Sequence, residues 1–194
     1  MPKRSFGPKT MVFPSPVFVI GSYGDDDVPN IATAAWAGIC CSKPPAVAVS
    51  WRPSRLTYEN IMRRGAFTVN IPGTQHVEQA DYAGIVSGRA GDKFAACGLT
   101  PLRSAHVDAP AVAEFPVVLH CRLLHSFELG CHTQLVGEIL DLEVEEAALD
   151  ARGRPDIRKI DPLIYSMGDR GYYGVGAFVA QAFAVGRRDT QGTN

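Results

Sequence analysis

The segment Ser50–Asn60 carries the residue types of a phosphate-binding site. Its candidate contacts are two guanidinium groups and two hydroxyl groups, from Arg52, Arg55, Ser54 and Thr57. They lie between an apolar run that predicts a strand over 46–51 and an amphipathic run that predicts a helix over 56–64. The first N–H groups of a helix have no intrahelical acceptor, and the helix dipole adds positive potential, so this point favours an anion. Arginine suits such a site because its planar fork can donate two parallel hydrogen bonds to phosphate oxygens.

The same residues also fit an ordinary helix start. In that interpretation Ser54 is the N-cap and both arginines are solvated surface charges. Because short motifs have false positives, the segment by itself leaves both interpretations open.

Motifs elsewhere in the chain favour the ligand site. The run Asn30–Trp36 follows a turn-rich stretch, 24–29, which predicts a hairpin with the apolar run 17–20. Its small alanines would let a flat ligand approach the backbone closely. Four further pieces follow in order: FTVNIP (67–72), GDKF (91–94), GCHTQLVGE (130–138) and PLIY (162–165).

Together with NIATAAW (30–36) and the R-x-x-R-x-T-x-x-N-I string (52–61), these pieces resemble the flavin reductase-like family, the FMN-binding split β-barrel proteins. Within that family the flavoredoxin-like branch is the most similar. The matching pieces span roughly residues 14 to 180. The resemblance implies a single-domain split β-barrel, mainly β with a few helices. It also implies FMN bound without a covalent link, usually at a homodimer interface.

The resemblance also implies a role for each matching residue. Arg52, Arg55, Ser54 and Thr57 would hold the FMN phosphate and ribityl chain, and Asn30, Thr33, Ala34 and Ser50 would line the polar edge of the ring. Lys93 would stand near the pyrimidine edge, where a cation stabilises the negative charge of reduced flavin. His132, as the candidate catalytic residue, and Tyr165 would complete the site, and Trp36 would pack beside the ring.

Each of these residues has a plainer interpretation. Asn30 is also a common turn residue. Trp36 could fill core, Lys93 could be solvated like most lysines, and His132 could be a hydrogen-bonded histidine at a hairpin.

A metal site is the rival interpretation of a His/Cys-rich stretch comprising His120, Cys121, His125, Cys131 and His132. On a strand, Cys121, His125 and Cys131 could share a face, but at about 3.3 Å per residue they would stand roughly 13 and 20 Å apart. Zinc ligands must converge on one ion, so we expect no metal here. The pair Cys40-Cys41 lacks C-x-x-C spacing, and we expect it to fill core or to pack beside the ligand.

No other catalytic motif stands out in the sequence. The sequence has no G-x-S-x-G elbow, no H-E-x-x-H motif and no G-x-x-x-x-G-K-[ST] loop. It also has no G-x-G-x-x-G fingerprint, so any nicotinamide nucleotide would have to bind without a Rossmann half.

The pattern of apolar residues predicts more strands than helices. The predicted strands are 17–23, 31–38, 46–51, 66–71, 117–129, 133–144 and a later candidate at 173–184. The predicted helices are 56–64 and 76–83, with a short turn near 92–97. The two long strands around Gly130 predict a β-hairpin, and the element count favours a barrel over a doubly wound sheet.

The length of 194 residues predicts one domain. We place an N-terminal extension at 1–13, the split-barrel domain at 14–186 and a polar tail at 187–194, with an exposed excursion at 147–159. A net charge of −1 and the lack of a long apolar run predict neither nucleic-acid binding nor a membrane span. The five scattered cysteines and the absence of a signal peptide predict a cytoplasmic, reducing location.

Two function classes remain open if the protein binds FMN. In the first, an FMN-dependent oxidoreductase takes electrons from NAD(P)H or a reduced protein and passes them to free flavin or a redox protein. In the second, a flavoredoxin-like carrier shuttles electrons between proteins and has no dedicated NAD(P)H site. A third and more remote alternative is that the barrel is a non-redox or haem-binding module.

Overall fold

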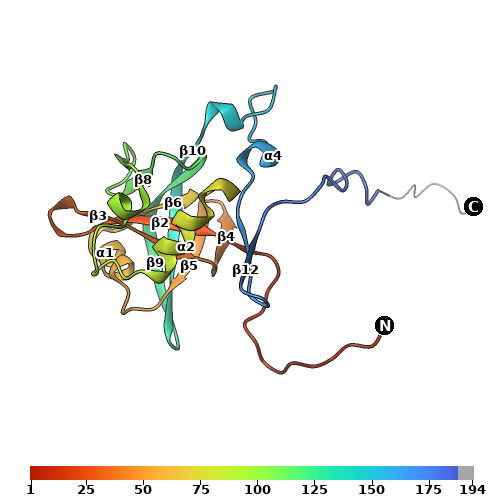
Figure 1. Cartoon of the computed structure of the whole chain (residues 1–194), viewed down its shortest axis with the longest axis horizontal. Helices are drawn as coiled ribbons and strands as arrows, with labels where there is room; N and C mark the ends of the chain where they lie inside the picture. The colour runs from red at the N-terminus through yellow and green to blue at the C-terminus, as the bar shows by residue number, and fades with distance from the viewer. Residues whose placement is uncertain (188–194) are drawn as a thin grey trace, which may run out of the picture.

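A seven-stranded antiparallel sheet dominates the computed structural model, which describes residues 1–187 (Figure 1). Its strands follow the order β3-β2-β6-β9-β10-β5-β4, and every neighbouring pair is antiparallel. The strands are β2 (Phe18–Tyr23), β3 (Pro29–Ala34), β4 (Ala37–Ser42), β5 (Pro45–Trp51), β6 (Ala66–Ile71), β9 (Val117–Leu129) and β10 (His132–Val144). The predicted mainly β, single-domain fold is confirmed.

The sheet curls around one core, because alternate residues of nearly every strand point to the same interior. Ile20, Val47, Phe67 and Leu135 are fully buried in this cluster and come from four different strands. Their neighbours in sequence point outward, as the two-residue period of a strand requires. The interior of the barrel is therefore filled with side chains.

A second core lies on the outer face of β2 and β3. Val19 and Ile31 point there and pack beneath helices α2 (Val77–Ile85) and α3 (Lys93–Cys97). Strand β2 is therefore buried on both faces, which explains why its run Phe18–Ile20 is apolar without alternation. This packing holds α2 and α3 close to β3, where the candidate site lies.

Helix α1 (Leu56–Arg64) directly follows β5 and packs on β2. Thr57, Asn60 and Ile61 form its buried stripe, with the three- and four-residue spacing of a helix face. The helix ends at Gly65, whose φ of 65° is the left-handed conformation that glycine adopts without strain. The Asn60 amide donates to the Ser22 hydroxyl at 3.2 Å and so ties α1 to β2.

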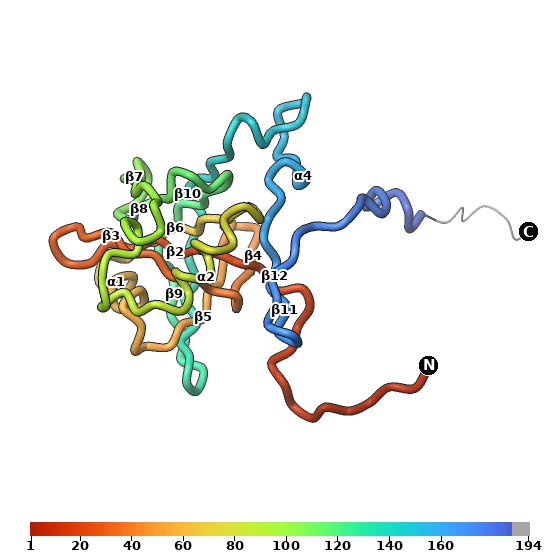
Figure 2. Tube along the Cα trace, viewed as in Figure 1, coloured from red at the N-terminus to blue at the C-terminus, as the bar shows by residue number. Residues whose placement is uncertain are grey.

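Smaller elements surround the barrel (Figure 2). They are the strands β1 (Ser15–Pro16), β7 (Pro101–Arg103), β8 (Pro110–Val112), β11 (Ile164–Ser166) and β12 (Gly171–Tyr173), the helix α4 (Ile157–Ile160), and the 3-10 turns Asp25–Asp27, Thr74–His76 and Glu146–Ala148. Strands β1, β11 and β12 form one small sheet, and β7 pairs with β8. The predicted excursion at 147–159 consists mostly of exposed turns and α4.

Several predicted boundaries agree with the structure and two do not. Strand 66–71, strand 117–129, helix 56–64 and the hairpin around Gly130 are confirmed. The predicted strand 31–38 is wrong at its end, because the chain bends at residues 35–36 and continues as β4. The predicted strand 173–184 is also wrong, since β12 ends at Tyr173 and no strand follows up to residue 187.

The cause of the second error is the lack of a pairing partner. Phe178 and Val179 are 75% and 94% exposed, so their apolar pattern is not matched by a neighbouring strand of the same chain. The predicted polar tail, apart from Arg187, lies outside the described residues. Among residues 1–187, no helix has both the length and the apolar character needed to cross a membrane.

Candidate functional site

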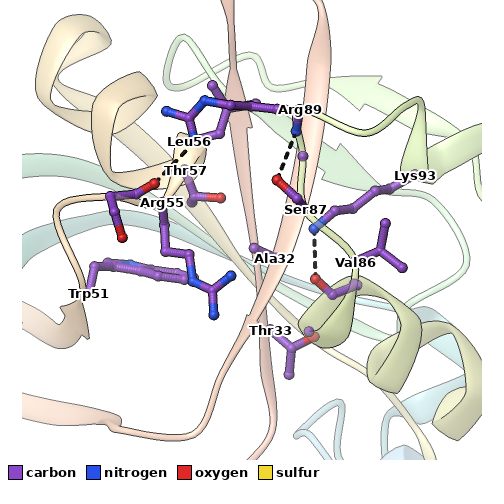
Figure 3. Close-up of a pocket in the computed structure, with 14 residues that line it drawn as sticks. Ala32, Thr33, Trp51, Arg55, Leu56, Thr57, Val86, Ser87, Arg89 and Lys93 are labelled. Atoms are coloured by element: carbon purple, nitrogen blue, oxygen red, sulfur yellow. Dashed lines mark hydrogen bonds between the residues drawn. The ribbon is translucent and has the colours of Figure 1, made fainter.

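A pocket of about 120 Å³ lies where the start of α1, strand β3 and the end of α2 meet (Figure 3). Three cations line it: Arg55, Arg89 and Lys93. Its other lining residues include Thr33, Trp51, Ser54, Thr57, Ser87 and Gly88. The predicted residues Thr33, Ser54, Arg55, Thr57 and Lys93 are thus brought together in one pocket.

Arg55 stands at the N-terminus of α1. It is the N-cap residue, and no side chain caps the helix. Ser54 is therefore not the cap that the ordinary helix start required, and the first N–H groups of α1 have no side-chain acceptor. Figure 3 shows the Arg55 side chain passing over Trp51 and pointing toward the space beside Ala32 and Thr33. The helix dipole and this guanidinium together make the end of the pocket attractive to an anion.

Thr57 is held by a buried hydrogen bond to β3. The Asn30 amide donates to the Thr57 hydroxyl at 3.0 Å, and the two residues are 6% and 2% exposed. Since the hydroxyl oxygen accepts from Asn30, its proton remains free to donate to a ligand oxygen. Asn30 does not line the pocket, and its hydrogen bond places it behind Thr57.

Lys93 is buried beside the C-terminal end of α2. Its ammonium donates to the Ile31 carbonyl at 2.9 Å and to the Ala83 carbonyl at 2.8 Å, and the side chain is only 3% exposed. An ammonium has three donors, so one remains for a ligand in the pocket. Burial, followed by the nearby Arg55 charge, lowers the pKa of Lys93 to about 8 from its ordinary 10.5. The solvated interpretation of this lysine is wrong.

The loop after α2 contributes residues that the sequence analysis did not select. Arg89 donates to the Ser54 carbonyl at 3.1 Å and to the Glu59 carboxylate, which holds the 86–89 loop against the start of α1. A Cβ on Gly88 would lie 2.4 Å from the Asn30 Oδ1 atom, so only glycine allows this close approach. The signal in the sequence was the S-G-R run at 87–89, an arginine in a small polar loop just ahead of the GDKF motif.

A second hollow of about 400 Å³ adjoins this pocket and shares Thr33 and Gly84 with it. Tyr165 lines this hollow, and its ring lies 5.6 Å from that of Tyr172. The Tyr172 hydroxyl donates to Asp81 at 2.8 Å. The Thr33 hydroxyl donates to the Ala80 carbonyl, so toward a ligand it can only accept.

Trp36 and His132 form a separate pair outside the pocket. Their ring centroids lie 4.7 Å apart, and the His132 Nδ1 atom lies 3.2 Å from the Cys131 sulfur. Trp36 is 42% exposed, so the interpretation that it fills core is wrong. The pair lies next to the pocket wall, because Thr133 pairs with the pocket residue Trp51 across β10 and β5. The half-buried Ser50 joins the two regions, since its N–H donates to the Trp36 carbonyl at 3.0 Å.

Two predicted contacts lie elsewhere. Arg52 is exposed and does not line the pocket. Ala34 points into the barrel core, where it packs with the interior cluster. The backbone of both residues remains close to the site, but their side chains do not contribute to the pocket.

The expectation that Cys40 and Cys41 fill core is wrong. Cys40 and Cys41 are exposed on the edge strand β4, so they neither fill core nor line the pocket. An edge strand has solvent beside it, and hydrophobic sequence alone does not reveal which strand is at the edge. The five His and Cys residues weighed as a metal site do not form a ligand group among residues 1–187.

The donor set fits the phosphate end of a nucleotide better than any apolar ligand. The Arg55 guanidinium, the Lys93 ammonium, hydroxyl groups and the free N–H groups of α1 line one small space, and Arg89 also lines it while paired with Glu59. Pockets for drug-sized ligands usually measure about 300–1,000 Å³. The pocket therefore fits an end group, and a bulkier portion of the ligand would extend into the adjoining hollow or over the Trp36–His132 pair.

Comparisons with known proteins agree with this arrangement. The model of the family described as flavin reductase like domain matches residues 10–175. The flavoredoxin of Desulfovibrio vulgaris (Miyazaki F) is 51% identical, with a TM-score of 0.92 over 95% of this chain and 100% of that one. A flavoredoxin from Methanosarcina acetivorans is 30% identical, with a TM-score of 0.89 over 96% of this chain and 98% of that one.

A more distant likeness concerns the fold alone. An FMN-binding protein from Thermus thermophilus is 23% identical, with a TM-score of 0.77 over 93% of this chain and 99% of that one. The family match covers most of the sequence and lies over the barrel and the pocket. The chain therefore belongs to the flavin reductase-like family.

Proposed function

We propose that this protein binds FMN without a covalent link and passes electrons through it as an oxidoreductase of the flavin reductase type. The observation that carries the proposal is the set of three cations, Arg55, Arg89 and Lys93, around the uncapped start of α1. A terminal phosphate is the part of FMN that such a set recognises. The flavoredoxins among the similar structures and the FMN-binding protein of the same fold support the choice of cofactor.

Each residue of the pocket has a distinct task in this proposal. Arg55 and Arg89 donate to the phosphate, the Thr57 hydroxyl donates to a phosphate or ribityl oxygen, and Asn30 keeps that hydroxyl in place. Lys93 directs its third N–H into the pocket. His132, packed on Trp36 beside the Trp51 wall, is the proposed catalytic residue at the ring.

The chemistry that FMN supplies when bound is the reversible uptake of two electrons at its ring. We expect the FMN-loaded protein to oxidise NADH or NADPH continuously when excess free FMN is present as acceptor. The measurement is the loss of nicotinamide absorbance over time. The same protein freed of FMN and assayed without added flavin is the control, and it should leave the nucleotide unoxidised.

The carrier alternative gives a different result in this experiment. If neither nucleotide is oxidised while a reduced redox protein bleaches the bound flavin, the chain is a flavoredoxin-like electron carrier. If the purified protein binds no flavin at micromolar concentration, both forms of the proposal are wrong.

Lys93 makes FMN binding depend on pH. An anion in the pocket favours the charged ammonium, which the free folded protein loses above its pKa of about 8. Binding above that pH therefore takes up a proton, and affinity should fall by up to about tenfold per pH unit. Since folding lowers this pKa, the unfolded chain binds more protons between about 8 and 10.5, so the contribution of Lys93 to stability increases with pH in that window.

The measurement is an FMN titration by flavin fluorescence, from neutral pH to one unit above the Lys93 pKa. Lys93→Met should bind FMN more weakly at neutral pH and should lose this pH dependence. Riboflavin, titrated in parallel, reports any change that does not involve the phosphate. An equal pH slope in the wild type and in Lys93→Met would show that another group titrates.

A homodimer completes the proposal. The two terminal segments extend away from the barrel (Figure 1). Their exposed apolar side chains include Phe6, Val12, Phe13, Phe178, Val179, Phe183 and Val185. A second copy would cover them and would also enclose the ring portion of FMN, for which a single pocket of this size gives little cover.

A further inference from the structure

A cluster of two histidines and two carboxylates is formed by β9, β10 and the loop between β7 and β8, and it shares no residue with the cationic pocket. Asp141 and Glu143 stand two residues apart on β10 and so point to the same face. His120 is paired directly with Asp141 across the β9–β10 ladder. His106 reaches the cluster from the loop between β7 and β8. Sequence spacing alone does not bring His106 to this point.

The donor atoms of three of these residues already converge. The His106 Nε2 atom lies 3.1 Å from Asp141 Oδ2 and 3.8 Å from Glu143 Oε1, and the ligand atoms of all three residues lie within 4.8 Å of one another. Two ligands on opposite sides of one ion, each at about 2.1 Å, stand at most about 4.2 Å apart. Both of the His106 distances are shorter than this limit, so small side-chain movements would suffice to enclose an ion.

The environment of His120 independently indicates that the cluster binds a ligand. It is only 1% exposed, and its Nε2 atom has no hydrogen-bond partner although it faces the cluster at 3.3 Å from Glu143 Oε2. Its other nitrogen lies 2.8 Å from the Ser104 hydroxyl, which already accepts the N–H groups of His106 and Val107. The hydroxyl proton is therefore left to donate to His120 Nδ1, and the His120 proton stands on Nε2, aimed into the cluster.

The charges of the cluster are not balanced by the protein. Within residues 1–187, Asp141 and Glu143 have ion-pair contacts only with the two histidines. A neutral imidazole leaves both negative charges uncompensated. One imidazole nitrogen with carboxylate oxygens is a donor set that first-row divalent ions accept.

We propose that His106, Asp141 and Glu143 bind a divalent metal ion of the Mn²⁺ or Zn²⁺ class. His120 is a positioning residue for this site. It does not coordinate the ion, and its buried N–H donates to a water molecule that completes the coordination shell. The site shares no residue with the FMN pocket, so the proposal stands independently of the cofactor.

Manganese is the sharper probe, because the exposed thiols of Cys40, Cys41 and Cys131 attract zinc. The full-length protein, freed of metal and of unbound flavin, is titrated with Mn²⁺ and the free ion is followed by its electron paramagnetic resonance signal. We expect one saturable ion per chain, released by chelator. Asp141→Asn and His106→Gln should each weaken binding by about tenfold or more.

Glu138→Gln is the matched control. Glu138 is another carboxylate of β10, but it pairs with Arg122 outside the cluster, and its loss should leave Mn²⁺ affinity unchanged. Unchanged circular dichroism and FMN binding show that the variants are folded. If no saturable binding occurs at millimolar Mn²⁺, or if Glu138→Gln weakens binding as much as Asp141→Asn does, the cluster is only a set of histidine–carboxylate ion pairs and the proposal is wrong.

Discussion

Replacing Arg55 with alanine is expected to raise the dissociation constant for FMN by about tenfold to a hundredfold. A charge-assisted hydrogen bond contributes about 1.5–3 kcal/mol, and each 1.4 kcal/mol is a factor of ten in affinity. Arg55 sits at the uncapped helix start and faces the pocket, so its loss removes both a donor and a nearby positive charge. Riboflavin, which lacks the phosphate, should lose much less.

Two further variants distinguish the loss of a direct contact with FMN from the loss of positive charge elsewhere on the protein. Arg152 is exposed in the 147–159 excursion, so Arg152→Ala removes the same charge away from the pocket and should leave the FMN affinity unchanged. Arg52→Ala tests the sequence-based assignment, and because Arg52 does not line the pocket we expect a smaller effect than for Arg55→Ala. Equal losses of FMN and riboflavin binding in Arg55→Ala would show that the guanidinium does not contact phosphate. Fluorescence titration of both flavins supplies all of these values.

Gly21→Ala should destabilise the protein more than other glycine-to-alanine changes in the sheet, by about 3 kcal/mol or more. A Cβ at this position of β2 would lie 2.0 Å from the Pro110 carbonyl oxygen and 2.4 Å from the Thr68 hydroxyl. That carbonyl accepts the Thr68 hydroxyl proton at 2.6 Å, so strand β8 is held against the sheet where the new methyl group must fit. The Pro110 backbone and the Thr68 side chain therefore both have to move.

Gly38→Ala is the internal comparison, since a Cβ there meets nothing within 4 Å. Gly38 also lies in a strand, β4, and its substitution is expected to stay within about 1 kcal/mol of the wild type because only the unfolded chain is restricted. Urea unfolding followed by far-UV circular dichroism gives both free energies of unfolding. Similar midpoints for the two variants would mean that β8 yields easily, contrary to its packing.

The parts of the fold that the sequence predicted are those set by local signals. Helix α1 begins after a turn with Pro53 and ends at Gly65, and the β9–β10 hairpin turns at Gly130, whose φ of 56° favours glycine. Alternating apolar residues then fix which face of each strand is buried. The family resemblance, confirmed by the domain match over residues 10–175, supplied the topology that such local patterns do not contain.

Other details of the site could not be predicted from the sequence, because they depend on contacts between segments that are distant along the chain. Asn30 and Thr57 are 27 residues apart in sequence, and their hydrogen bond lets Asn30 hold the Thr57 hydroxyl in place. Arg89 lines the pocket because its hydrogen bond to the carbonyl of Ser54, 35 residues earlier in the sequence, holds the 86–89 loop against the start of α1. The Ala34 side chain points into the core and not into the pocket, because successive residues of a strand face opposite sides of the sheet.

The hydrogen bonds from Asn30 to Thr57 and from Asn60 to Ser22 have a consequence for how fast a ligand can be captured. They clamp α1 to β3 and β2 through buried groups that do not involve a ligand, so the wall of the pocket is already in place in the empty protein. The conformational entropy of ordering that wall is lost during folding, and little of it remains to oppose association. Capture of an anionic ligand then needs no slow rearrangement of α1, and its rate is set by diffusion and by the electrostatic attraction of the cations at the pocket mouth.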